Sequence, residues 1–102
     1  MGLALLGDKL PATQAEAWGL IWRSVDDDEL MTTALATARQ FAAGPTRAYV
    51  RTREAMESGL KLSLEGALDL ERDYQRDLGR TSDYREGVTA FIEKRASRFT
   101  GS

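Results

Sequence analysis

Proline and glycine residues divide this sequence into segments that are each long enough for one short helix. Pro11 suits the first position of a helix, where a missing N–H costs nothing, and Gly19 suits the left-handed residue that ends one. Pro45 and Gly59 repeat this arrangement. The spacing predicts a mainly α chain of about five or six short helices, with a short extended segment at residues 20–25.

Polar residues mark where the other helices begin. Residues 26–29 are four consecutive carboxylates, which favour the positive end of a helix that runs to Gly44. Ser63 is a good N-cap for a helix that Gly79 ends. Three leucines of that helix are predicted to face a core: Leu64, Leu68 and Leu78.

The segment from residue 83 to 99 combines a helix start with an apolar stripe. Thr81 or Asp83 can cap this helix, and Glu86 stands at the reciprocal position of a D-x-x-E capping box. Apolar residues then follow at helical spacing, which predicts a face that lies on a core. These residues are Tyr84, Val88, Phe91 and Ile92.

Three cations, Lys94, Arg95 and Arg98, follow the apolar stripe. One interpretation is that they stabilise the negative C-terminal end of the helix and pair with nearby acids. The other is a phosphate clamp, in which Lys and Arg bind a polyanion while an aromatic side chain packs on its base. Composition by itself favours the first interpretation, and it favours a core position for Phe91.

The composition excludes several kinds of site. With no His and no Cys, the chain cannot form a disulfide, a thiolate zinc site or an imidazole base. The net charge of −2 argues against a nucleic-acid-binding face, and the apolar runs are too short to span a membrane. A cytoplasmic location is therefore expected. Residues 26–29 lack the ligand spacing of a calcium loop, so no metal site and no catalytic constellation are recognised.

The order of residues 69–99 resembles the C-terminal end of the crotonase superfamily, the enoyl-CoA hydratases and isomerases. The closing helix of that family reads D-x-x-E-G-x-x-A-F-x-E-K-R-x-P-x-F. Residues 5–30 resemble an upstream family segment, and Ser97 departs from the closing pattern, where the family has Pro. The matching residues are Asp83, Glu86, Gly87, Ala90, Phe91, Glu93, Lys94, Arg95 and Phe99.

This resemblance implies the C-terminal helical region of the crotonase fold, with the ββα spiral core absent from these residues. Residues 1–25 would hold the end of a core helix, a short helix and a short extended segment, and residues 26–102 the C-terminal helical region. Family members stabilise a thioester enolate in an oxyanion hole and move protons with carboxylates, and both belong to the absent core. No catalytic residue is therefore expected here.

The same motif implies a role in binding coenzyme A. Phe91 and Lys94 match the family positions that meet the adenosine end of CoA, and Arg95 and Arg98 are weaker candidates for its phosphates. The resemblance implies an acyl-CoA thioester substrate, no cofactor beyond the CoA that the substrate carries, and a trimer or hexamer. The stretches "LERDYQR" and "DYREGVTAF" are most similar to the ring-1,2-epoxyphenylacetyl-CoA isomerase branch of phenylacetate catabolism.

Three hypotheses for function follow. The first is the CoA-binding and oligomerisation part of an enoyl-CoA hydratase or isomerase, inactive as an isolated fragment. The second is a helical interaction or oligomerisation module without catalysis, which would use apolar residues such as Leu5, Trp18 and Trp22 to bind a partner. The third is a truncated relative that joins full-length trimers and inactivates them.

Overall fold

A computed structural model describes residues 2–102, and helices account for most of that range. No strand forms among these residues, which confirms the mainly α prediction. The chain packs as two compact units, residues 1–36 and residues 37–102, and each is described by itself. The boundary expected after residue 25 stays a prediction. The helices are α1 (Gly2–Leu6), α2 (Ala12–Ala17), α3 (Leu30–Ala42), α4 (Thr46–Gly59), α5 (Leu64–Leu78) and α6 (Ser82–Glu93).

In the first unit, helix α2 begins and ends where proline and glycine predicted. Pro11 precedes it, and Gly19 follows in the left-handed conformation with φ +71°. The Gly19 N–H donates to the Glu16 carbonyl at 2.9 Å, and the Leu20 N–H donates to the Ala15 carbonyl at 2.8 Å. This pair of bonds is a Schellman motif, in which glycine occupies the left-handed position at little cost.

Two local predictions for residues 20–29 differ from the structure. Residues 20–25 form bends and irregular backbone in place of an extended strand. Residues 27–29 form a turn in front of α3, whose first residue is Leu30, so the carboxylates precede the helix and do not form its first turn. The Glu29 N–H donates to the Asp26 carbonyl at 3.0 Å, a backbone bond that closes this turn.

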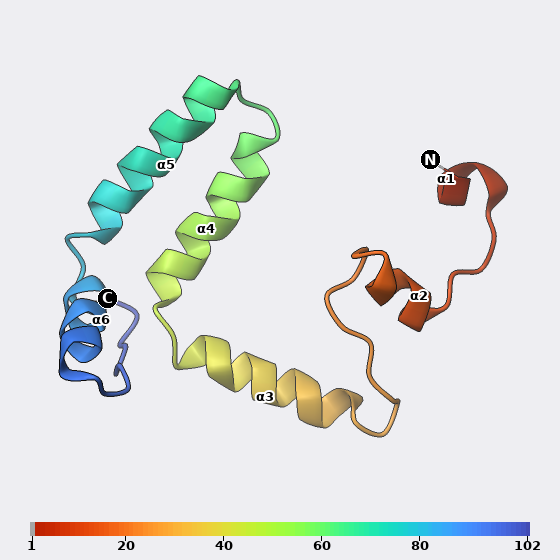
Figure 1. The fold of residues 1–102 in the computed structure, drawn as a ribbon, viewed down its shortest axis with the longest axis horizontal. Coiled ribbons are helices and arrows are strands. Elements are labelled where there is room, and N and C mark those ends of the chain that lie inside the picture. Colours follow the sequence, from red (N-terminus) through yellow and green to blue (C-terminus); the bar gives the residue numbers. More distant parts are fainter. Residues whose placement is uncertain (1) are drawn as a thin grey trace. The chain divides into compact units, whose positions relative to one another are not determined.

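In the second unit, α4 and α5 lie against one another as a helical hairpin (Figure 1). The Gly66 N–H donates to the Ser63 Oγ at 3.2 Å, so Ser63 caps α5 as predicted. Across the hairpin, the Arg51 guanidinium lies 4.7 Å from the centre of the Tyr74 ring, a cation–π contact. The ends of the two helices are set by local signals, because each cap and each stop acts within one turn of the chain.

The predicted inward faces of α5 and α6 are largely uncovered. Leu64 is 77% exposed, Leu68 is 56% exposed and Phe91 is 85% exposed. The apolar side chains that are buried among residues 2–102 are small, Ala15 and Ala90. The prediction was wrong for this chain because periodicity identifies an apolar face, whereas burial requires a second layer packed against it.

No helix between residues 2 and 102 is both long and apolar enough to cross a membrane. The same residues contain no group of three or more acidic side chains arranged to hold a metal ion.

Candidate functional site

The candidate site is built around the start of α6 and the tail that follows it. The Tyr84 N–H donates to the Thr81 Oγ1 at 3.1 Å, so Thr81 is the N-cap. Asp83 lies inside the first turn and is 5% exposed. The capping box predicted for Asp83 is therefore wrong, because the chain enters the helix two residues earlier, at the threonine.

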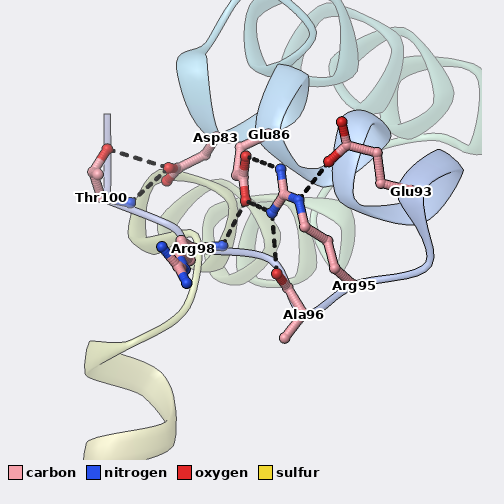
Figure 2. Close-up of polar contacts among 7 residues, drawn as sticks. All are labelled: Asp83, Glu86, Glu93, Arg95, Ala96, Arg98 and Thr100. Carbon is pink, nitrogen blue, oxygen red and sulfur yellow. Dashed lines mark hydrogen bonds and ion pairs between the residues drawn. The ribbon is translucent and has the colours of Figure 1, made fainter.

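The Asp83 carboxylate binds the tail. It accepts a hydrogen bond from the backbone N–H of Thr100 at 2.8 Å (Figure 2). It accepts another from the backbone N–H of Gly101 at 2.9 Å. Just before these anchored residues, the Phe99 ring lies over Gly87, where an added Cβ would be 3.6 Å from the ring. Residues 94–102 therefore fold back along α6.

Glu86 lies one turn after Asp83 and makes a two-point ion pair with Arg95. The Arg95 Nη1 donates to Oε1 at 2.6 Å, and its Nη2 donates to Oε2 at 3.0 Å (Figure 2). The Arg98 backbone N–H donates to the same Oε1 at 2.7 Å. The hydrogen bonds from Arg95 and then from Arg98 lower the pKa of Glu86 to about 2, because they stabilise its ionised form.

A pH dependence follows from this lowered pKa. The ordinary pKa of this group is 4.5, so ionised Glu86 stabilises the fold fully above pH 4.5, and this contribution is lost as pH falls towards about 2. The variant Glu86→Gln never gains it. The melting temperatures of the wild type and this variant should therefore differ by a constant amount above pH 4.5 and converge near pH 2. A difference that persists unchanged at pH 2 would contradict the assignment.

The C-terminal end of α6 is a second Schellman motif. The Lys94 N–H donates to the Phe91 carbonyl at 3.3 Å, and the Arg95 N–H donates to the Ala90 carbonyl at 3.0 Å. Lys94 occupies the left-handed position, with φ +53° and ψ +40°. It is the non-glycine residue with a positive φ in the described part of the chain.

The four residues predicted to contact CoA lie close together in sequence but differ in their partners. Arg95 is fully engaged: besides Glu86, its Nε donates to the Glu93 carboxylate at 2.6 Å. No ion pair within residues 2–102 involves the Lys94 ammonium or the Arg98 guanidinium, and Figure 2 draws no dashed line to the Arg98 guanidinium. For Arg95, pairing with nearby acids is thus what the structure contains. The Arg98 charge also acts on Glu86 and helps to lower its pKa, and Lys94 has no ion pair within residues 2–102.

Phe91 lines a groove of about 670 Å³ within the second unit. Tyr84, Val88 and Phe99 form part of its apolar wall. Phe91 is 85% exposed, so it offers an open apolar face three residues before Lys94 in the sequence. Sequence reasoning identified these groups but missed the tail-binding role of Asp83. The D-x-x-E spacing places Asp83 and Glu86 one turn apart on α6. From that spacing, the binding of both carboxylates to the tail could have been predicted.

Comparison with known proteins identifies the family of this chain. The family model for enoyl-CoA hydratase/isomerase matches residues 1–102. The chain belongs to the enoyl-CoA hydratase/isomerase family. Its mainly helical structure is the C-terminal helical region of the crotonase fold, and the described residues contain none of the ββα core.

Members of the enoyl-CoA hydratase/isomerase family resemble the chain over nearly all of its length. It is 52% identical over 101 residues to the 1,2-epoxyphenylacetyl-CoA isomerase of Escherichia coli, covering 99% of this chain and 38% of that protein. It is 42% identical over 101 residues to a "Probable enoyl-CoA hydratase" of Rhodobacter capsulatus, covering 99% of this chain and 39% of that protein.

The fold comparison agrees with the sequence comparison. The crystal structure of an enoyl-CoA hydratase/isomerase from Mycobacterium paratuberculosis superposes with a TM-score of 0.84 at 30% identity. The match covers 94% of this chain and 38% of that one. The chain thus spans less than half the length of these relatives.

Proposed function

We propose that residues 1–102 are the CoA-binding and oligomerisation part of an enzyme that isomerises or hydrates acyl-CoA thioesters in the cytoplasm. On this proposal, the oxyanion hole and the catalytic carboxylates lie in other residues, so these residues are inactive by themselves. The observation that carries the proposal is that one helix end presents an exposed aromatic ring, Phe91, and a cation, Lys94, for which no ion pair occurs within residues 2–102.

This pairing suits the nucleotide end of coenzyme A. The Lys94 ammonium can donate charge-assisted hydrogen bonds to a phosphate, which are stronger than neutral ones. The Phe91 ring can pack against the adenine, since aromatic faces stack well on flat bases. Arg98 can add a second positive charge near the phosphates. CoA enters as part of the substrate, so no further cofactor or metal is proposed.

The substrate class follows the 52% identity to the Escherichia coli isomerase. We propose ring-1,2-epoxyphenylacetyl-CoA, and hence a step of phenylacetate catabolism. The acyl group would be contacted mainly by the core of the enzyme. Turnover of this substrate by the longer enzyme, compared with turnover of straight-chain enoyl-CoA, tests the assignment.

The binding proposal is tested with Lys94→Ala in the longer enzyme that contains this sequence. Loss of a charge-assisted hydrogen bond should weaken CoA binding about tenfold. The lost affinity belongs to the one phosphate of CoA that Lys94 contacts. Titration calorimetry with CoA and with dephospho-CoA, which lacks one phosphate, shows whether that phosphate is the one contacted. Lys61→Ala, which removes an exposed lysine of the α4–α5 turn, is the matched control. Unchanged CoA affinity in Lys94→Ala would refute the assignment of Lys94.

A second candidate is a non-catalytic helical module that assembles through its apolar surface. Large exposed side chains favour it, such as Trp22 at 77% and Leu60 at 90% exposed. The mass of the polypeptide made by its native cell separates the two. A mass well above 11.3 kDa supports the enzyme, in which these faces pack against the core or against the other subunits of a trimer or hexamer. A mass of 11.3 kDa favours the module.

A further inference from the structure

The two Schellman motifs of this chain differ at one position. Helix α2 ends with Gly19 in the left-handed conformation, whereas α6 ends with Lys94 in it. A side chain with a Cβ adopts this conformation at a cost, since the Cβ approaches the following carbonyl. Backbone strain of this kind persists where the surrounding structure holds it in place, and it concentrates at functional positions.

Arg95 supplies what holds the turn. In most Schellman motifs the residue after the left-handed position makes an apolar contact back to the helix. Here that residue is Arg95, and its guanidinium bridges Glu86, nine residues earlier, at 2.6 Å and 3.0 Å. The same guanidinium donates to the Ala96 carbonyl at 3.1 Å. The bridge therefore ties both sides of the turn to the body of α6.

The bridge also leaves Lys94 without an internal partner. Glu93 is adjacent to Lys94 in sequence, and Glu86 is the other acid that binds this turn, through Arg95. Arg95 occupies both, at 2.6 Å to each carboxylate. An ammonium on a flexible side chain would otherwise form an ion pair with such acids. That ion pair would have to break before any anion could bind. Figure 2 shows one cation, Arg95, bound to both Glu86 and Glu93.

We propose that Glu86 and Arg95 are positioning residues for Lys94. Their two-point ion pair locks the left-handed turn, keeps both neighbouring acids occupied, and so presents the Lys94 ammonium to a phosphate of the ligand. This inference rests on the function proposed above, in which the ligand is coenzyme A. It adds two residues, Glu86 and Arg95, that need not touch the ligand. They act by holding the backbone of Lys94 in the left-handed turn and by leaving its ammonium without an acidic partner.

The test removes the bridge without changing the local charge. Arg95→Lys keeps the positive charge but cannot make the planar two-point pair. The double variant Glu86→Gln/Arg95→Gln removes one charge of each sign. In the longer enzyme, each variant should weaken CoA binding about fivefold, as expected for one side chain that must now be immobilised on binding. The affinity for dephospho-CoA should fall in the bridge variants only to the extent that it falls in Lys94→Ala.

A double-mutant cycle with Lys94→Ala completes the test. Positioning residues have no effect once their target is gone, so adding Arg95→Lys to Lys94→Ala should leave CoA affinity unchanged. A loss of dephospho-CoA affinity where Lys94→Ala causes none, or effects that add to that of Lys94→Ala, would show a merely structural role and overturn the inference. Wild-type affinity in both bridge variants would also overturn it.

The same measurements separate this inference from the function on which it rests. A loss in Lys94→Ala with none in the bridge variants overturns the positioning role alone. No loss in Lys94→Ala overturns both. If the double variant does not fold, Arg95→Lys carries the test, because it keeps a cation that can still pair with Glu86 through one hydrogen bond.

Discussion

Replacing Asp83 with alanine is expected to release the tail from α6 and to cost about 2 kcal/mol of local stability. Its carboxylate is 5% exposed and accepts two backbone N–H bonds, from Thr100 and from Gly101. Hydrogen bonds to a charged group contribute more than neutral ones, but the released N–H groups regain water, which limits the loss. Amide hydrogen exchange at Thr100 and Gly101 should accelerate about thirtyfold.

The matched control for this prediction is Asp83→Asn. An amide keeps one oxygen acceptor but loses the charge and the second acceptor, so exchange at one of the two tail amides should stay slow. Thr81, the N-cap, is left intact in both variants, so α6 itself should keep its helical circular dichroism. Slow exchange at both amides in Asp83→Ala would mean that the tail is held by other contacts.

Replacing Gly44 with alanine is expected to destabilise the second unit by about 2 kcal/mol through overpacking. Gly44 is buried at the corner before α4, and an added Cβ would lie 2.6 Å from the Cζ of the Tyr49 ring. The ring would have to move away. That movement would break its edge-to-face contact with Phe41, whose ring centre is 5.5 Å distant. Urea unfolding measures the loss of free energy.

A second background isolates the cause of that loss. In Tyr49→Ala the ring that the new methyl would strike is absent, so adding Gly44→Ala should change the free energy of unfolding by less than about 0.5 kcal/mol. The φ angle of Gly44 is not positive, so alanine causes no backbone strain there. An equal cost in both backgrounds would show that the corner, and not the Tyr49 ring, requires glycine.

The boundaries of the helices were the best-predicted part of the fold. Pro45 before α4, Ser63 as the cap of α5 and Gly19 after α2 all act as expected. These signals are local, because a cap or a stop depends on φ, ψ and hydrogen bonds within one turn. The family resemblance was also confirmed, since it depends on the order of residues along the chain.

The candidate site was predicted only in part, because its main contacts join residues far apart in sequence. Phe91 was predicted to face a core and is 85% exposed, and the contact of Phe91 and Lys94 with CoA stays a prediction. Asp83 was predicted to cap, yet it binds Thr100, 17 residues later. The left-handed turn at Lys94 carries no glycine to signal it, and the pair that holds it spans nine residues.

For this protein, the sequence by itself determined the helical class, most of the helix ends and the family, because each of these depends on neighbours along the chain. Only the tertiary structure decided which charged side chains form ion pairs within residues 2–102 and which do not. Glu86 could have paired with Lys94, with Arg98 or with no cation, and it pairs with Arg95 because the tail folds back along α6. That choice depends on where a distant segment lies in space, and local propensity does not contain this information.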